Sequence, residues 1–525
     1  MRDIVIVGGG FAGWYTAVAL RTHHADINIT LIDSDKFPRL GVGETLGWSS
    51  PYDFKKLLGL KDDRILMRQT GAIYKYGVTA TDFYNDNTSY SYGKFFNLKI
   101  KSLAKFYGNF DYPEFYEPWS RQPGDVGLQQ AWLSINKNNN KNFNDYILEL
   151  NEASYFVKSA SAPYDSYNNY ILRPTDGYSY HVDAEQTVSF LKNNAVNINH
   201  ISSPVVDIIK NSQGIDHLLL ENKDKITGDL FIDASGFSRI LAKEVNDTWT
   251  NMSSDYCNSA WVCPSKYIAP KIEMTGGTEF YGEDYGWRFK IKLYHRIGNG
   301  YIFNNNMIDK DIPLQRLLKL TGNTRLKDPK LISWTPGYYR TPWVKNVLAL
   351  GVAHHMIDPF DGPSFDIHSR SLEDLLKVFL LDDAAQEFNK SMTKVTHERN
   401  LRLLFTFGIS KRQGEFWDTR RKMMQSKESE FKKILNEETP ELESRLTHFW
   451  QQMYYRMCMA GEMDRKQFNA VELTDADKAM AESFFAYNRA RNKYIATQAW
   501  PNYYEWLKAN RFNGMTSEEI LDELR

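Results

Sequence analysis

The chain has 525 residues, of which 42% are hydrophobic and 25% are charged, as in an ordinary globular protein with two or three structural units. Its 64 Lys and Arg nearly balance its 65 Asp and Glu, so composition excludes a strongly charged protein that binds nucleic acid or an anionic membrane. Three cysteines without a CxxC pair cannot build a disulfide framework, and no apolar run approaches the ~18 residues of a spanning helix. We expect a cytoplasmic protein.

The N-terminus predicts a dinucleotide-binding turn. Residues 3–7 (DIVIV) have the pattern of a buried strand, the run 8–13 (GGGFAG) follows at once, and residues 14–21 continue as a helix. Gly8, Gly10 and Gly13 complete the GxGxxG template with a strand before it and a helix after it. We expect Gly8 to form the tight turn, Gly10 and Ala12 to admit a pyrophosphate, and Gly13 to allow close packing of the helix on the strand.

A second apolar strand is predicted over residues 27–32, and it ends in Asp33, twenty residues after Gly13. An acidic residue at this place accepts hydrogen bonds from the adenosine ribose. Strand, glycines, helix, strand and terminal acid together therefore predict a nucleotide cofactor.

Two later segments favour FAD over NAD. Residues 228–236 (GDLFIDASG) predict a strand that ends near Asp233 and Gly236, and residues 346–353 (NVLALGVA) predict a strand that ends at Gly351, shortly before Asp358. A large FAD-binding module places such segments around the pyrophosphate and the ribityl chain. Because no second GxGxxG follows a strand, we expect reducing equivalents to come from outside the chain.

Five segments together resemble the flavin-dependent halogenases of the tryptophan halogenase type. They are GGGFAGW at 8–14, PRLGVGE at 38–44, GAIYK at 71–75, YHVDA at 180–184 and IDASGF at 232–237. The resemblance implies that Arg39, Gly43 and Glu44 lie in a strap between the flavin site and the substrate site. It also implies that Lys75 is the catalytic lysine.

The resemblance implies an α/β fold. Its FAD-binding Rossmann-like module, of the glutathione-reductase type, carries an antiparallel sheet on the substrate side and a helical C-terminal module. We expect residues 1–370 to form the FAD module, with an aromatic-rich insertion over about 84–170 made of irregular loops, and residues 371–525 to form helices that complete the substrate site. In that family, reduced FAD and O2 oxidise a halide to hypohalous acid. The acid passes through a tunnel to the lysine beside an aromatic substrate.

The halide end of the site departs from the family pattern. Where the family has Asp-Pro-Leu-Glu-Ser-Thr-Gly, this chain has DPFDGPS over 358–364. Asp361 takes the place of the glutamate, with one methylene less reach, and remains a plausible base. Gly362 and Ser364 are the predicted halide contacts, but Pro363 has no N–H to donate. We therefore expect a weakly donating site that prefers bromide or iodide to chloride.

A second departure concerns the family's Trp-x-Trp-x-Ile-Pro motif, which reads WRFKIK over 287–292 here. Trp287 is kept, whereas Phe289 and Lys292 replace the second Trp and the Pro. Since that motif discourages monooxygenase chemistry, its erosion leaves a flavin monooxygenase of the same fold as an alternative. A flavin-binding protein without turnover is a third alternative.

The remaining predictions concern substrate contacts, metal ligands and partners, and no sequence motif carries them. Trp287, Phe106, Tyr454 and Tyr455 are candidate substrate contacts, and core packing would explain them equally well. No metal-ligand cluster is evident, because the His354–His355 pair lacks a matched third ligand. The expected partners are a small aromatic substrate and a separate flavin reductase that supplies reduced FAD. The sequence leaves open which ring is modified, whether a carrier protein presents it, and whether the chain forms a homo-oligomer.

Overall fold

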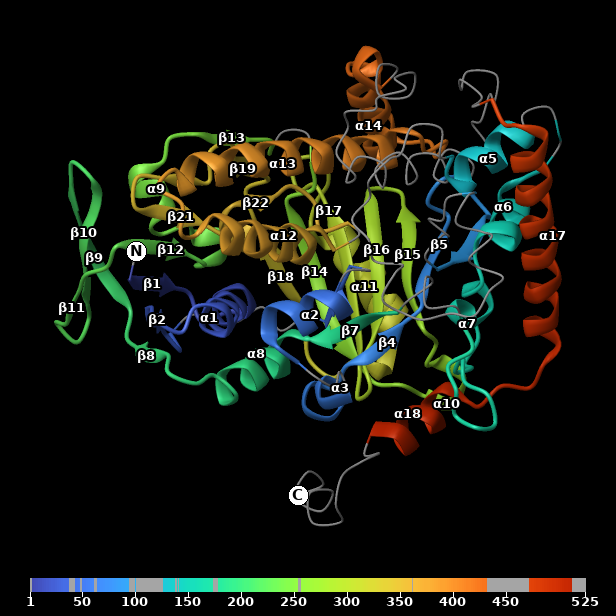
Figure 1. The fold of residues 1–525 in the computed structure, drawn as a ribbon, viewed down its shortest axis with the longest axis horizontal. Helices are drawn as coiled ribbons and strands as arrows, with labels where there is room; N and C mark the ends of the chain where they lie inside the picture. Colours follow the sequence, from blue (N-terminus) through green and yellow to red (C-terminus); the bar gives the residue numbers. More distant parts are fainter. Residues whose placement is uncertain are drawn as a thin grey trace.

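The computed structural model describes residues 2–36, 43–47, 50–60, 64–93, 100, 126–136, 139, 141–172, 178–253, 256–360, 362–431 and 472–511. These residues form a mixed α/β fold in which a parallel sheet at one end is followed by a large, mainly antiparallel sheet, with helices packed around both (Figure 1). The predicted fold class is confirmed.

The first sheet is the predicted dinucleotide fold, with strand order β20-β21-β12-β1-β2-β8. Its strands are β1 (Asp3–Val7), β2 (Asn28–Asp33), β8 (Asn199–Ser202), β12 (Leu230–Asp233), β20 (Trp343–Val344) and β21 (Val347–Ala349). All neighbouring pairs are parallel except β20 with β21. The central strand β1 is buried on both faces, which explains its nearly continuous apolar sequence.

The second sheet has seven strands in the order β18-β14-β17-β16-β15-β5-β6. They are β5 (Gly77–Thr81), β6 (Ser89–Tyr92), β14 (Ser259–Ser265), β15 (Gly277–Glu283), β16 (Gly286–Lys292), β17 (Ile297–Phe303) and β18 (Lys330–Ser333). Every pair is antiparallel except β5 with β15. This is the mainly antiparallel sheet that the resemblance implied, and its place on the substrate side stays a prediction.

A small sheet positions the residue predicted to be catalytic. In it, β7 (Ser179–Asp183) lies between β3 (Gly43–Thr45) and β4 (Ile73–Lys75), and both pairings are antiparallel. The strand β4 is separated from β5 of the large sheet by one residue. The predicted strap and the predicted lysine strand are therefore both hydrogen-bonded to β7.

The longer helices of the C-terminal part occupy two places (Figure 1). Helices α12 (Pro363–Val378), α13 (Ala384–Gly408) and α14 (Glu415–Gln425) pack in succession, and α12 also contacts α1 (Phe11–His23) of the dinucleotide fold. Helix α17 (Asp475–Thr497) lies at the other end, beside α6 (Phe143–Leu150). The helices expected over residues 371–525 are thus present in the described part of that segment as the end of α12 and as α13, α14 and α17. The predicted division at residue 370 falls inside α12 and stays a prediction.

The other helices and strands complete the layers. They are α2 (Ser50–Leu58), α3 (Arg64–Thr70), α5 (Leu128–Ile135), α7 (Ser154–Lys158), α8 (Ala184–Asn193), α9 (Ala242–Val245), α10 (Pro270–Glu273), α11 (Asp311–Thr321), α18 (Tyr503–Arg511), β9 (Val205–Asn211), β10 (Gly214–Leu220), β11 (Lys225–Ile226), β13 (Trp249–Asn251), β19 (Gly337–Tyr339) and β22 (His355–Met356). Short 3-10 turns are formed by Gly236–Ser238 (η4), Gly322–Thr324 (η5) and Gly351–Ala353 (η6).

The expectation of irregular loops over 84–170 was wrong for the described part of that segment, which contains β6, α5, α6 and α7. Helix α6 shows why. The Asn142 side chain accepts hydrogen bonds from the N–H groups of residues 144 and 145, and the Asp145 carboxylate accepts one from the N–H of Asn142. This reciprocal capping starts the helix. The buried residues Phe143, Tyr146, Ile147 and Leu150 have helical spacing.

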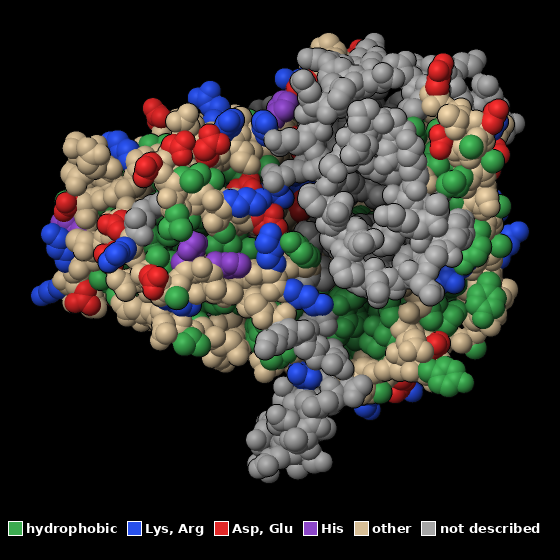
Figure 2. All heavy atoms as spheres, viewed as in Figure 1, with side chains coloured by type: hydrophobic (Ala, Val, Ile, Leu, Met, Phe, Trp, Pro, Cys, Tyr) green, Lys and Arg blue, Asp and Glu red, His purple; other side chains and the backbone are tan. Residues whose placement is uncertain are grey.

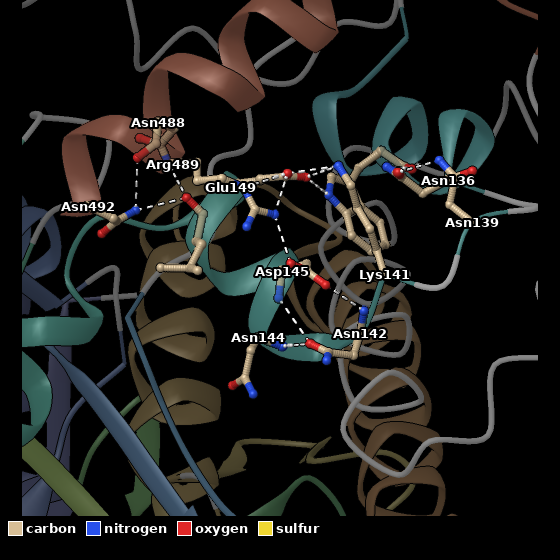
Figure 3. A network of polar contacts seen from close by, with 12 residues as sticks. Asn136, Asn139, Lys141, Asn142, Asn144, Asp145, Glu149, Asn488, Arg489 and Asn492 are labelled. Atoms are coloured by element: carbon tan, nitrogen blue, oxygen red, sulfur yellow. Dashed lines mark hydrogen bonds and ion pairs between the residues drawn. The ribbon is translucent and has the colours of Figure 1, made fainter.

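A polar network ties α6 to α17 across more than three hundred residues of sequence (Figure 3). The buried Glu149 carboxylate accepts hydrogen bonds from the Trp132 indole, the Lys141 ammonium at 2.8 Å and the Arg489 guanidinium at 2.7 Å. Asn492 donates to the carbonyl oxygen of Asn151 at 2.6 Å. The aromatic-rich segment and the helical tail are therefore one packed unit in this region.

Acidic and basic side chains are interspersed over the described part of the face in Figure 2, as the balanced composition predicted. No helix of the described residues is long and apolar enough to cross a lipid bilayer.

Candidate functional site

The turn after β1 depends on glycine at two points. Gly8 has φ +123°, and a Cβ on it would lie 2.2 Å from the carbonyl oxygen of Ala234. A Cβ on Gly13 would lie 1.8 Å from the carbonyl oxygen of Gly8. Both contacts are far inside van der Waals distance, so only glycine lets α1 begin this close to β1 and β12. The roles predicted for these two glycines follow from their geometry.

Gly10 differs from these two glycines, because a Cβ on it would meet no atom of the described residues within 4 Å. It is the N-cap residue of α1 and has no side chain that could cap the helix, and no acidic residue lies in the first turn. A helix start with free N–H groups, a positive dipole end and open space in front of it fits a pyrophosphate. The residues present therefore fit the dinucleotide part of FAD.

The end of β2 contains a contact that the sequence did not predict. His200, on β8, donates a hydrogen bond from Nε2 to Oδ1 of Asp33 at 2.8 Å. The Asp33 carboxylate also lies against the turn, since a Cβ on Gly9 would be 2.2 Å from its Oδ2. The ribose contact of Asp33 stays a prediction, and His200 is added as the residue that orients this carboxylate. Only the parallel pairing of β2 with β8 brings the two together.

The second predicted acid, Asp233, has a full set of protein partners. Its Oδ1 accepts hydrogen bonds from the N–H and hydroxyl of Ser235, and its Oδ2 accepts from the N–H groups of Leu241 and Ala242 at 2.8 Å. These bonds shape the turn through Gly236, which has φ +70°. Asp233 is therefore placed to support the turn beside the cofactor site, and a direct FAD contact from it stays a prediction.

Gly351, after β21, lies against the first turn of α1. It has φ +59°, and a Cβ on it would lie 2.8 Å from the Cβ of Ala12 in the first turn of α1. The strand β21 thus ends against the start of the dinucleotide helix. Ala12 and Gly351, both predicted to be near the cofactor, are brought together by the fold.

Residues 43–47, which are the end of the predicted strap (38–44) and the three residues after it, lie beside β7 and are called the strap from here on. Protein surrounds the Glu44 carboxyl closely enough to raise its pKa from 4.5 to about 7, although the side chain still reaches solvent. Its neighbour Thr45 is buried, and a Cβ on Gly362 would lie 2.6 Å from the carbonyl oxygen of Thr45. The strap therefore touches the start of α12, where the halide contacts were predicted.

Lys75 is buried, with 4% of its surface exposed, at the end of β4. Its ammonium donates a hydrogen bond to the carbonyl oxygen of Leu46 at 3.0 Å. Ser179 of β7 lies opposite Lys75 in the pairing of β4 with β7, and its hydroxyl donates to the same carbonyl oxygen at 2.9 Å. A lysine on the surface of a strand would point into solvent, whereas this one points into the protein and contacts the strap.

His181, on the polar face of β7, lies beside Lys75 of the neighbouring strand β4. It is buried, with hydrogen bonds to the carbonyl oxygen of Lys292 at 3.0 Å and to the hydroxyl of Thr278 at 2.6 Å. Burial, followed by the positive charges of Lys75 and Lys292, holds the pKa of this imidazole well below its usual range. His181 is therefore neutral. The motif YHVDA contained this residue, but the sequence assigned it no role.

The loop before α12 is anchored by Asp358. Its Oδ1 accepts hydrogen bonds from the Trp287 indole at 3.1 Å and from the N–H of Phe360 at 3.0 Å. Burial raises the pKa of this carboxyl, and the nearby Arg420 guanidinium opposes the rise. Trp287 is fully buried and packs edge-to-face on Phe360. These contacts hold the loop in place, while the predicted FAD contact of Asp358 and substrate contact of Trp287 stay predictions.

Several predicted residues cannot be placed. Arg39, Phe106, Asp361, Tyr454 and Tyr455 lie outside the described residues, as does the side chain of Ser364. Among the residues that the structure does describe, no group of three His, Cys, Asp or Glu side chains could hold a metal ion, and His354 and His355 form no such site.

The comparisons with known proteins agree with this architecture. The tryptophan halogenase family model matches residues 3–471. KtzR, a 7-chloro-L-tryptophan 6-halogenase of Kutzneria sp. (strain 744), is 23% identical over 97% of this chain and 99% of its own length. ThaL, a tryptophan 6-halogenase of Streptomyces albogriseolus, is 25% identical over 69% of this chain and 67% of its own length.

Two solved structures share the fold. The tryptophan 6-halogenase SttH of Streptomyces toxytricini superposes with a TM-score of 0.77 at 19% identity, covering 97% of this chain and 99% of that one. BrvH, a flavin-dependent halogenase of Brevundimonas sp. BAL3, superposes with a TM-score of 0.74 at 21% identity, with the same coverage. With the family model matched over most of its length, the chain belongs to the tryptophan halogenase family and is a flavin-dependent halogenase, an oxidoreductase.

Proposed function

We propose that this enzyme uses reduced FAD, O2 and a halide ion to halogenate a small aromatic compound. The substitution is electrophilic and takes place on the aromatic ring beside Lys75, with bromide or iodide preferred to chloride. A separate flavin reductase supplies the reduced FAD, because the described fold contains one dinucleotide turn and the sequence has no second one. The reaction at the ring replaces one hydrogen of the arene by halogen and releases water from hypohalous acid.

The observation that carries this proposal is the position of Lys75. A buried ammonium, held by the Leu46 carbonyl in the strap, can hydrogen-bond to a small oxidant in a site that excludes bulk water. The dinucleotide turn, whose open space lies at Gly10, is the place for FAD. When bound, reduced FAD supplies the two electrons that let O2 oxidise the halide to hypohalous acid.

The residues of this chain then have separate roles. The Lys75 ammonium donates a hydrogen bond to the oxygen of hypohalous acid and makes the halogen more electrophilic. Asp361 accepts the proton that leaves the ring. The strap, from Glu44 to Leu46, separates the oxidant from solvent on its way between the two sites.

The halide preference rests on the donors at the start of α12. The N–H of Gly362 is directed to the carbonyl oxygen of Pro359 at 3.3 Å, and Pro363 has no N–H at all. One backbone donor of this turn is therefore already used and a second is absent, which weakens the site for an anion. Chloride holds its hydration shell more tightly than bromide or iodide, so a poorly donating site disfavours chloride most.

One experiment tests the proposal directly. The purified protein, a flavin reductase, NADH, FAD and O2 are supplied with chloride, bromide or iodide and a panel of phenols, indoles and other electron-rich rings. Mass spectrometry identifies the products. We expect halogenated rings with bromide and iodide, less product with chloride, and none from a Lys75→Ala variant that still binds FAD and reoxidises it. Preferred chlorination would overturn the halide preference, and an unaffected Lys75→Ala variant would overturn the role of the lysine.

A flavin monooxygenase is the second candidate, favoured by one observation. Phe289 replaces the second Trp of the family motif, and its ring packs over Gly300 on the neighbouring strand β17. In the same assay without halide, a monooxygenase gives hydroxylated rings. A halogenase gives only oxidised flavin and hydrogen peroxide.

A further inference from the structure

One face of β7 carries polar side chains that the proposed mechanism does not use. Strand alternation places Ser179, His181 and Asp183 on this face, while Tyr180 and Val182 point into the apolar core. Register then sets the neighbours. His181 lies opposite Thr45 of β3, and Ser179 lies opposite Lys75 of β4. The strap and the lysine strand therefore meet on either side of His181.

Three side chains form a hydrogen-bonded chain from β7 to the strap. His181 Nε2 lies 2.6 Å from the hydroxyl of Thr278 on β15, and that hydroxyl lies 2.9 Å from the hydroxyl of Thr45. All three residues are buried. Thr45 is also the residue whose carbonyl oxygen meets Gly362.

The direction of each hydrogen bond follows from the acceptor at the far end. The Lys292 carbonyl can only accept, so Nδ1 of His181 must carry the proton and donate to it. Nε2 of the neutral ring then has only a lone pair, so the Thr278 hydroxyl donates to it. The oxygen of Thr278 in turn accepts from the Thr45 hydroxyl. One tautomer of one ring thus fixes the orientation of both threonines.

We propose that His181 is a positioning residue of the halogenation site. Through Thr278 it holds Thr45, and thereby seats the strap against both Lys75 and the start of α12. The inference rests on the proposed role of Lys75, because the strap matters for halogenation only if the ammonium bound to Leu46 takes part in it.

The charges around His181 are consistent with a neutral, orienting ring. Lys75 faces it from β4 and Lys292 from β16, and the Lys292 ammonium is paired with Glu279 of β15. Asp183, the next polar residue on the same face, is paired with Arg296 and His295 and caps α8. A second function as a cation would place a third positive charge between two buried lysines, so orientation by hydrogen bonds is the role that remains.

Paired substitutions at Thr278 test the chain. Thr278→Val removes the hydroxyl with little change of shape, whereas Thr278→Ser keeps it. With bromide and indole as probes, we expect Thr278→Val to form about ten-fold less bromoindole per reduced FAD consumed, the scale of one broken buried hydrogen-bond chain. Thr278→Ser should stay within about two-fold of the wild type. Flavin reoxidation and FAD affinity should be unchanged in both.

A matched control removes the same group elsewhere. Thr79, on β5, bonds to the hydroxyl of Ser91 at 2.9 Å, outside this chain of contacts. Thr79→Val should leave the yield of bromoindole unchanged. A readout that needs no substrate is hydrogen–deuterium exchange, in which the peptide covering the described strap residues 43–47 should exchange faster in Thr278→Val than in Thr278→Ser.

The outcomes separate the two proposals. If Lys75→Ala abolishes bromination but Thr278→Val matches Thr278→Ser in yield and in exchange, the inference about His181 is wrong and the proposed function stands. If Lys75→Ala brominates indole as the wild type does, the proposed function fails. In that case faster strap exchange in Thr278→Val would still support the positioning of the strap, and unchanged exchange would exclude it.

Discussion

The ammonium of Lys75 and the carbonyl oxygen of Leu46 lie 3.0 Å apart, in a buried contact between the strand β4 and the strap. Leu46 follows β3, and its N–H donates to the carbonyl oxygen of Tyr180 at 3.0 Å. The lysine is therefore held by a backbone group that is itself fixed by the central strand of the small sheet. The flexible Lys75 side chain is held in one position by this hydrogen bond.

Replacing Lys75 by Met should show whether the ammonium is needed for halogenation or the side chain only for packing. The Met side chain keeps the apolar stem but removes the ammonium, while Ser179 still satisfies the Leu46 carbonyl. We expect halogenation to fall by at least about 100-fold, the usual contribution of a positioned proton donor. The melting temperature should change little. Initial rates with bromide and an electron-rich ring, together with a thermal melt, measure both. A Met variant with wild-type rates would refute the role of the ammonium.

The glycines of the dinucleotide turn give a prediction with opposite outcomes at neighbouring positions. Gly10→Ala should fold normally, because its Cβ meets no atom of the described residues, but should bind FAD at least about ten-fold more weakly if the pyrophosphate occupies that space. Gly13→Ala should fail to fold, because its Cβ would collide with the Gly8 carbonyl oxygen. Fluorescence titration of FAD and circular dichroism distinguish the two. Wild-type FAD affinity in Gly10→Ala would mean that the cofactor binds elsewhere.

These two sites also show what the sequence could predict. The turn of residues 8–13 is local, and each glycine is required by atoms only a few residues away or on an adjacent strand of a common motif. Its position and its roles could therefore be inferred without a structure. The pairing of Asp33 with His200 could not, because it depends on β8 lying beside β2 although the two residues are 167 positions apart in the sequence.

The small sheet shows the same limit. The resemblance gave Lys75, the strap and the YHVDA motif as separate matches. Only the register of β7, with Thr45 opposite His181 and Lys75 opposite Ser179, shows that they meet. The helix α6 is a different case, since its apolar spacing was present in the sequence but was masked by the many aromatic and Asn residues around it.

Burial of His368 predicts how stability depends on pH. Burial lowers the pKa of this imidazole from 6.5 to about 4. The unfolded chain binds a proton below about pH 6.5 that the folded protein cannot bind until about pH 4, so stability is lost as the pH falls through this range. At about pH 5 the loss amounts to about 2 kcal/mol. Urea unfolding at about pH 7 and about pH 5 should show a smaller difference for His368→Gln than for the wild type.

The control for this prediction is a buried residue of the same helix that does not titrate. Ser371 donates from its hydroxyl to the carbonyl oxygen of Ile367 at 2.7 Å, so Ser371→Ala should lower the free energy of unfolding by about the same amount at both pH values. Equal pH dependence in His368→Gln and the wild type would show that the buried ring is not the source.

The network between α6 and α17 predicts an order of stabilities. Glu149→Gln leaves the Lys141 cation without its buried carboxylate and Arg489 with Asp145 alone, so we expect it to lower the free energy of unfolding by about 3 kcal/mol. Arg489→Gln leaves Glu149 bonded to Lys141 and Trp132 and should cost only about 1 kcal/mol. Chemical denaturation measures both. Because α17 is held to the aromatic-rich segment by this carboxylate, Glu149→Gln should also speed hydrogen exchange throughout α17. Equal destabilisation by the two variants would mean that the Arg489 contact, not the shared carboxylate, holds the helix.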